Sequence, residues 1–289
     1  MMADRPSEYD GWAWLYNRTM GPEYGREQHE LLQRVLLPRV PAHAEILDLC
    51  CGTGQLIQYL VDDGYRVTGL DGSEEMLACA RQNAPSANYI LEDARNFKPV
   101  ESFDAVFSTS ASLNHVPSMK ELKQVFENVY TSLRQGGLFV FDLNHPAQLT
   151  KWWKGRPTEG VVADDCSWIL TPRYSSVDKT GAFRVTMYEQ PKQLSFISKL
   201  AAGMKRPLYR TLSRDRFIGM RLKLLSVFHL CEPSWKKTEI DFPIVGHNLD
   251  AVKSALEETG FPRVELETID GRTQIDDDHS AHFICSKAA

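Results

Sequence analysis

The sequence lacks the features that would place the protein in a membrane or in the secretory route. No apolar run approaches the ~18 to 20 residues that a membrane-spanning helix needs. The first residues, MMADRPSEYDGWAW, contain no basic stretch leading into an apolar one, so they do not resemble a secretory signal. We therefore expect a cytoplasmic protein.

Basic residues are not in excess either. The chain has 33 Lys and Arg residues against 38 Asp and Glu residues, and its net charge is −5. A dedicated nucleic-acid-binding protein needs a surplus of Lys and Arg to neutralise phosphates, so this balance disfavours a nucleic-acid partner.

Cysteine is present but not in the pairs that bind metals. The six cysteines are scattered, with no CxxC pair, at Cys50, Cys51, Cys79, Cys166, Cys231 and Cys285. This pattern indicates reduced thiols in a cytosolic protein, with neither a disulfide framework nor a zinc site. We predict no metal site.

The amino-acid composition is typical of a soluble globular protein, with 43% hydrophobic and 25% charged residues. At about 150 residues per domain, 289 residues suggest two domains or one domain with a large insert.

From residue 26 to 143, helical periodicity alternates with short apolar runs. Helices are predicted over 26–37, 54–63, 73–83 (with Ser73 as its N-cap) and 118–133, and strands over 45–50, 65–70, 87–91, 103–108 and 138–141. Strands separated by helices of this length are typical of βαβ units, which form a parallel sheet.

The alternation stops after Asn144. Antiparallel strands are predicted over 160–190 and 218–242, a helix over 192–217, then a helix over 249–259 and strands over 263–268 and 282–286. We therefore predict a doubly wound, Rossmann-like, mostly parallel seven-stranded sheet with an inserted antiparallel β-rich domain. The expected divisions are 1–144 and 244–289 for the α/β domain and 145–243 for the insert.

The most informative stretch is ILDLCCGTG, residues 46–54. It predicts a strand, a tight Gly-x-Gly turn and the start of a helix, where glycines allow a ligand close to the backbone and the helix offers unpaired N–H groups. Asp71 stands nineteen residues past Gly52, at the end of the next strand. An acidic residue there can accept hydrogen bonds from ribose hydroxyls.

Two cofactor classes fit this pattern. A nicotinamide dinucleotide site has the spacing G-x-G-x-x-G, but Ile57 occupies the third glycine position here. Asp48, before the turn, would repel a pyrophosphate and attract the amino group of a methionine moiety. The electrostatics therefore favour a sulfonium nucleoside, although an NAD-dependent oxidoreductase stays an alternative.

These segments resemble those of class I S-adenosylmethionine-dependent methyltransferases. LDLCCGTG is similar to their first motif, LDLGCGTG, with Cys50 in place of the first glycine; VTGLDGSEEMLACAR, LEDARNF, FDAVFSTSASLNHV and GGLFVFDLN are similar to the following segments. The N-terminal YDGWAWLYN resembles the opening of small-molecule members. The likeness covers about 130 residues, with the helix before Gly260 in addition.

The resemblance implies a set of contacts with S-adenosylmethionine. Those residues are Asp48, Cys51, Gly52, Gly54 and Ser108 around the methionine part and turn, Asp71 at the ribose, and Gly72, Met76, Asp93 and Ala94 at the adenine. Asp93 has an alternative role, which is to cap a turn before Arg95. Cys50 and Cys51 are expected to be structural thiols, because Asp48 denies them an electropositive setting.

His115 and Tyr16 are the candidate catalytic residues. The resemblance places His115 beside the transferred methyl, where it could act as a base near neutral pH; equally, it could cap the next helix. Tyr16, with Tyr9 nearby, could orient the acceptor or bury its ring against Trp12 and Trp14.

Residues 192–223 contain nine Lys or Arg and one acid, Asp215. Leu200, Met204, Leu208 and Leu212 recur every four residues, which predicts a basic amphipathic helix. It could bind an anionic substrate or an acidic membrane surface, or be a solvated face, and we expect no membrane association.

Together these features predict a methyltransferase acting on a nitrogen or oxygen of a small molecule, with the insert over the cleft. The alternative outside enzymology is a nucleoside-binding module that works through a partner. The sequence does not indicate an oligomeric state.

Overall fold

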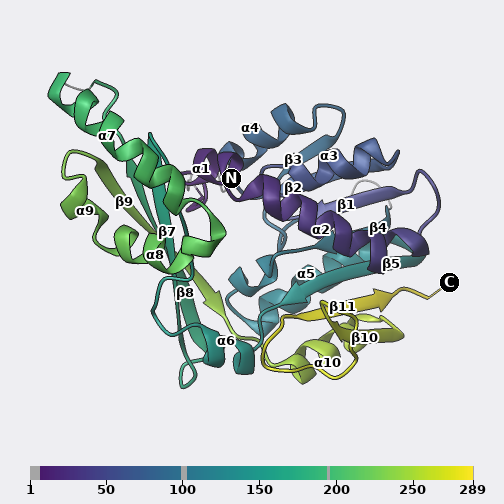
Figure 1. The fold of residues 1–289 in the computed structure, drawn as a ribbon. Helices are drawn as coiled ribbons and strands as arrows, with labels where there is room; N and C mark the ends of the chain where they lie inside the picture. The colour runs from purple at the N-terminus through teal and green to yellow at the C-terminus, as the bar shows by residue number, and fades with distance from the viewer. Residues whose placement is uncertain (1–6, 99–102, 194–195, 289) are drawn as a thin grey trace. The chain divides into compact units, whose positions relative to one another are not determined.

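A computed structural model describes residues 7–98, 103–193 and 196–288 of the chain (Figure 1). They divide into two compact units. The first comprises Met1–Lys151 and Val245–Ala289, and the second comprises Trp152–Ile244.

In the described part of the first unit, seven strands form one sheet in the order β10-β11-β5-β4-β1-β2-β3. They are β1 (Glu45–Leu49), β2 (Arg66–Asp71), β3 (Asn88–Leu91), β4 (Phe103–Ser108), β5 (Leu133–Leu143), β10 (Arg263–Thr268) and β11 (Ala281–Ser286). Only β11 runs antiparallel to its neighbours, β5 and β10. The predicted mostly parallel, doubly wound sheet is confirmed.

Helices cover both faces of this sheet (Figure 1). They are α1 (Ala13–Arg18), α2 (Gly21–Val35), α3 (Gln55–Asp62), α4 (Glu74–Asn83), α5 (Met119–Ser132), α6 (Pro146–Trp152) and α10 (Leu249–Thr259), with short 3-10 turns at Leu37–Arg39 and Ser112–His115. Phe139 and Phe141 of β5 pack with α5 and α10, whereas Val140 packs with α2 and α3. Side chains of one strand alternate between faces, so β5 contributes to both cores.

Local signals fix several helix ends as predicted. Ser73 caps α4, because its hydroxyl accepts a hydrogen bond from the Met76 N–H at 3.1 Å. Ser118 caps α5 by accepting from the Glu121 N–H. Gly260 ends α10 in the left-handed conformation, with φ 118°.

Other boundaries differ from the prediction. α2 starts at Gly21 instead of residue 26, with a proline in its first turn, where the missing N–H costs nothing. β5 starts at Leu133 and runs through the glycine pair that we expected to separate helix from strand. Phe103 pairs with Leu133 across a register shift, so pairing with β4 starts before the glycines.

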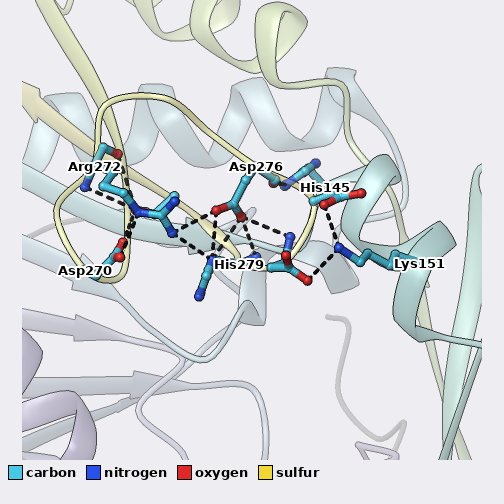
Figure 2. A network of polar contacts seen from close by, with 9 residues as sticks. His145, Lys151, Asp270, Arg272, Asp276 and His279 are labelled. Carbon is cyan, nitrogen blue, oxygen red and sulfur yellow. Dashed lines mark hydrogen bonds and ion pairs between the residues drawn. The ribbon is translucent and has the colours of Figure 1, made fainter.

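The loop between β10 and β11 is held by a network of charged groups (Figure 2). Asp276 accepts from Arg272 at 2.8 Å and from His279 at 2.9 Å, and its backbone carbonyl lies 2.9 Å from Nε2 of His145. Lys151, at the end of α6, pairs with Asp277 at 2.8 Å. These contacts join the loop between β10 and β11 to both ends of α6.

The second unit has an antiparallel sheet in the order β6-β7-β8-β9 within its described residues. Its elements are β6 (Glu159–Val162), β7 (Cys166–Ser175), β8 (Thr180–Glu189), α7 (Phe196–Leu212), a 3-10 turn at Asp215–Phe217, α8 (Ile218–Ser226), α9 (Phe228–Cys231) and β9 (Lys236–Val245). The prediction of strands over 218–242 is therefore wrong as far as residue 231. Arg221, Leu225 and Phe228 are buried at helical spacing, which the high content of β-branched and aromatic residues obscured.

The predicted apolar stripe of α7 is found only in part. Leu212 is buried as predicted, but Met204 is 71% exposed and Leu208 52% exposed. Tyr209, outside the predicted stripe, is buried as well. The side chain of Leu200 lies outside the described residues. Two basic residues of the segment 192–223 form ion pairs, Lys205 with Glu232 and Arg206 with Asp164.

No helix in the described part of the chain combines the length and the hydrophobicity that crossing a lipid bilayer requires.

Candidate cofactor site

The turn between β1 and α3 is built from left-handed backbone. Cys50, Gly52 and Gly54 have φ values of 68°, 54° and 74°. The N–H groups of Cys50 and Cys51 donate to the Leu70 carbonyl at 2.8 and 3.0 Å, which fastens the turn to β2. Glycine adopts this conformation without strain, but Cys50 carries a side chain through it.

Close packing explains why glycines stand around this turn. A Cβ on Gly54 would lie 2.8 Å from the Cβ of Ala80, so only glycine lets α4 approach so closely. A Cβ on Gly69 of β2 would lie 2.7 Å from Cδ1 of Ile57. Gly69 on β2 is therefore the glycine that allows α3 to pack closely against the strand. In a dinucleotide-binding fingerprint that glycine is on the helix, at the position that Ile57 occupies here.

Asp71 connects the turn to the next strand. Its carboxylate accepts hydrogen bonds from the N–H of Gly52 at 2.8 Å and of Ser73 at 2.9 Å. Burial raises the pKa of Asp71, and these backbone N–H groups oppose the rise. The side chain thus shapes the glycine turn directly, a role that sequence spacing alone did not indicate.

The site is rich in buried acidic groups. Asp48 is only 2% exposed, and its pKa is raised by burial and then by the nearby charge of Asp71. Burial and the same carboxylates raise the pKa of the Cys50 and Cys51 thiols. Both cysteines are therefore neutral thiols at physiological pH, and the site favours a cationic group over an anionic one.

A cavity of about 70 Å³ opens at the turn, the size of one end of a ligand rather than of a whole nucleoside. Of the predicted residues it is lined by Tyr16, Asp48, Cys51 and Gly52, together with Tyr24, Gln28, Thr53, Gln55, Thr109, Ser110 and Ser112, among others. The other predicted contacts are not among the residues that line it.

Those other residues have defined places. Met76 and Ala94 are buried, and Ser108 is buried at the end of β4 beside the Cys50 thiol. A Cβ on Gly72 would have only the Glu92 carbonyl near it, at 4.0 Å, so the chain is open there.

Asp93 is engaged by its neighbour. Its carboxylate accepts from the Arg95 backbone N–H at 2.8 Å and from the Arg95 side chain at 2.9 Å. Burial raises the pKa of Asp93, but the hydrogen bonds from Arg95 outweigh it and lower the pKa. The turn role that we kept as an alternative is therefore present in the structure.

The two candidate catalytic residues belong to one aromatic group. Tyr16 packs edge-on against Trp12, with ring centres 5.2 Å apart, and its ring lies about 4.0 Å from where a Cβ of Gly52 would be. His115 lies edge-on to Tyr9, whose hydroxyl is 2.8 Å from Nε2. Tyr9 in turn contacts Trp12.

The loop that carries His115 has supports that sequence reasoning missed. Ser110 and Ala111 have φ values of 60° and 55°, and both oxygens of the buried Asp142 lie 3.0 Å from the Ala111 N–H. Asn114 accepts from the Asn144 N–H and donates to the carbonyls of Asn144 and Val245. The one available signal was position, since Asp142 and Asn144 stand at the carboxyl end of β5, the edge where ligands bind in such sheets.

These residues fit S-adenosylmethionine. The buried Asp48 lines the cavity and the half-buried Asp71 fastens the turn beside it, and two carboxylates suit a ligand with an ammonium and a sulfonium charge. Within the described residues, no group of three His, Cys, Asp or Glu side chains is arranged to hold a metal ion.

Comparison with known proteins agrees with this geometry. The methyltransferase domain family matches residues 46–137. The chain is 28% identical over 150 residues to the dTDP-3-amino-3,4,6-trideoxy-alpha-D-glucopyranose N,N-dimethyltransferase of Streptomyces venezuelae, covering 52% of this chain and 58% of that protein. It is 37% identical over 128 residues to the malonyl-[acyl-carrier protein] O-methyltransferase of Enterobacter lignolyticus, covering 42% and 48%.

The likeness in structure extends further along the chain. The sugar N-methyltransferase KedS8 from Streptoalloteichus matches with a TM-score of 0.69 and 16% identity, over 100% of this chain and 96% of that one. In sequence, the chain spans about half the length of the two curated relatives.

The fold is that of solved S-adenosylmethionine-dependent methyltransferases, and the glycine-turn site lies within the stretch that matches the methyltransferase domain family. Another solved structure with this fold, the amino pentose methyltransferase CalS10 from Micromonospora echinaspora, contains bound S-adenosylmethionine; it matches with a TM-score of 0.60 and 14% identity over 100% of both chains.

Proposed function

We propose that the protein transfers a methyl group from S-adenosylmethionine to a nitrogen or oxygen of a small molecule. The observation that carries this proposal is the left-handed turn at Gly52, fastened by the Asp71 carboxylate beside the buried Asp48. A rigid glycine turn with two carboxylates suits a cationic nucleoside and disfavours a pyrophosphate.

S-Adenosylmethionine, when bound, supplies a methyl group that its sulfonium charge already activates. Asp48 and Gly52 would hold the methionine end, and Asp71 would accept from the ribose while keeping its bond to the turn. Gly72, Met76, Asp93 and Ala94 would surround the adenine. Tyr16, packed over Gly52, would exclude water from the methionine end.

His115 and Tyr9 would act on the acceptor. An amine in its neutral form needs only to be aligned, whereas a hydroxyl must lose a proton during the transfer. Burial and the charge of Asp71 raise the pKa of Tyr9, so its phenol stays neutral. The hydrogen bond to Nε2 then lets the pair hold or pass on one proton.

The acceptor we favour is an amino group on a small polar molecule. The N,N-dimethyltransferase named above acts on a dTDP-amino sugar by its printed name, and the sugar N-methyltransferase fold matches along the chain. The O-methyltransferase relative keeps an oxygen acceptor as the second candidate. We infer that the acceptor is selected by residues outside the family match at 46–137, including Tyr9 and Tyr16.

The test is calorimetric titration of the purified chain with S-adenosylhomocysteine, with NADH in parallel. Saturable binding of S-adenosylhomocysteine alone is expected. A screen with labelled cofactor over small amines and alcohols then follows. Binding of NADH alone would overturn the proposal; cofactor binding without turnover on any acceptor would favour a binding module that acts through a partner.

A further inference from the structure

A cavity of about 370 Å³ lies within the second unit. Its floor is one face of the antiparallel sheet, formed by Thr171 and Arg173 of β7, Arg184 and Thr186 of β8, and Lys237 and Glu239 of β9. These are alternate residues, so all their side chains emerge on the same face. The cavity shares no lining residue with the one at the glycine turn.

The two faces of this sheet differ in character. The opposite face carries the buried apolar residues Trp168, Val185, Met187 and Phe242. The cavity face carries an apolar cluster as well, in which Ile169 and Tyr188 pack with Leu225, and that cluster contains none of the charged residues. The charged side chains on the cavity face are therefore not required to build the core.

The arginines retain hydrogen-bonding capacity. Arg184 donates to both oxygens of Asp241, from Nε and Nη2 at 2.8 Å each. Arg173 reaches the same carboxylate only through Nη2, at 3.1 Å. Among the described residues, Nη1 of neither arginine has a hydrogen-bond partner, so both can bind a further acceptor.

The local charge is positive. Three cations, Arg173, Arg184 and Lys237, stand against Glu239 and the adjoining Asp241. His229 of α9 also lines the cavity, and its ring has no bonded partner in the described part of the chain. A ligand with one negative charge would balance this group.

Apart from Ser226 and the Tyr188 hydroxyl, the rest of the cavity lining is apolar. Ile169 and Tyr188 are buried in the floor, and Leu225 closes one side from α8. The volume lies at the lower end of the roughly 300 to 1,000 Å³ found for small-molecule sites. The cavity thus suits a compact molecule with an apolar body and an anionic end.

We propose that this cavity is a ligand site for a small organic anion, whose carboxylate or phosphate group is bound by Arg173 and Arg184 and whose apolar part lies against Ile169 and Tyr188. Guanidinium groups present paired N–H donors that match the oxygens of both kinds of anion. This site is additional to the proposed methyl transfer and does not depend on it.

The experiment is calorimetric titration of the full chain with benzoate and phenyl phosphate, and with benzyl alcohol as the neutral control. Saturable binding of benzoate or phenyl phosphate is expected, and the tighter of the two identifies the preferred anion. Absence of saturable binding by both anions would overturn the proposal. Equal binding of benzyl alcohol would overturn it too, because charge would then play no part.

Arg173→Met tests the assignment, since Arg184 still pairs with Asp241 in that variant. Anion binding should weaken about tenfold or more. Lys236→Met is the matched control, because Lys236 lies on β9 but on the opposite face, and its binding should match wild type. Circular dichroism checks folding, and Lys237→Met replaces Arg173→Met if the latter is unfolded. Wild-type anion affinity in a folded variant would contradict the site.

Discussion

The hydroxyl of Tyr9 lies 2.8 Å from Nε2 of His115, although 106 residues separate them in the chain. The contact joins the N-terminal segment to the loop after β4. In the proposed reaction, Nε2 of His115 would therefore act on an acceptor through the Tyr9 hydroxyl. Any proton taken from an acceptor by this pair passes through, or is oriented by, the Tyr9 hydroxyl.

Tyr9→Phe removes that hydroxyl and leaves the ring contacts with Trp12. Turnover on a hydroxyl acceptor should fall about 10² to 10⁴-fold, as for loss of general acid–base help, with unchanged affinity for S-adenosylhomocysteine. Steady-state rates and calorimetry measure the two effects. His115→Ala should behave alike, and Tyr59→Phe, on the exposed α3 surface, is the control. Full turnover in Tyr9→Phe and His115→Ala would show that the pair is structural.

Asp71→Ala should weaken binding of S-adenosylhomocysteine by about 1.5 to 3 kcal/mol, or ten- to a hundredfold, because charged hydrogen bonds to the ribose are lost. The loss of its bond to the Gly52 N–H adds to the effect by loosening the turn. Calorimetric titration measures the change. Asp62→Ala, at an exposed position on α3, should bind like wild type. An unchanged affinity in a folded Asp71→Ala variant would refute the ribose assignment.

Cys50→Gly should stabilise the protein. Cys50 has a φ of 68°, a conformation that costs a residue with a side chain about 1 kcal/mol and costs glycine little. The free energy of unfolding in urea should therefore rise by about that amount. The same replacement in a helix has the opposite sign, so Cys79→Gly in α4 should lower the free energy of unfolding by roughly a few tenths of a kcal/mol. Destabilisation by Cys50→Gly would mean that packing of the thiol outweighs the backbone strain.

Asp142 predicts a pH dependence of stability. Burial raises the pKa of Asp142 from 3.8 to about 6, so the folded chain binds this proton more tightly than the unfolded chain does. Its contribution to the free energy of unfolding is thus fully present below about pH 4 and is lost as the pH rises through about 6. The loss amounts to about 2 to 3 kcal/mol.

Urea unfolding of wild type and Asp142→Asn across this range measures the effect. The variant cannot ionise at this position, so the difference between the two curves isolates Asp142 from other groups. Buried His282, whose pKa is lowered to about 4 by burial, acts in the opposite direction in both proteins. Parallel curves would show that the carboxyl at Asp142 is not held as the structure indicates.

Much of the fold was predictable because its signals are local. The Gly-x-Gly turn, the Ser73 cap and Gly260 each act within a few residues, and the βαβ alternation then implies a parallel sheet. The same local pattern placed Asp48, Cys51 and Gly52 at one cavity, whereas Tyr16 reaches it from α1. The roles of these residues toward a cofactor stay predictions.

What could not be predicted depends on contacts between distant segments. The hydrogen bond that Asn114 donates to the Val245 carbonyl joins residues 131 positions apart. The one that the Ala111 N–H donates to Asp142 joins residues 31 positions apart. No local spacing encodes such pairs. Helices α8 and α9 were not predicted for another reason. Only Arg221, Leu225 and Phe228 follow the helical spacing in this short segment, and its many β-forming residue types favoured strands instead.

The amide of Asn114 has a consequence for how the chain could have been assembled. One nitrogen donates to the Asn144 carbonyl at 2.9 Å and to the Val245 carbonyl at 2.7 Å, so the outgoing and returning ends of the interrupted α/β unit meet at a single side chain. About a hundred residues connect Asn144 to Val245 along the chain. The carbonyls of these two residues are nevertheless only a few ångströms apart, because they accept from the same nitrogen. A short glycine linker would close this gap, and segments of very different length could be exchanged at this junction while the sheet and its glycine turn keep their register.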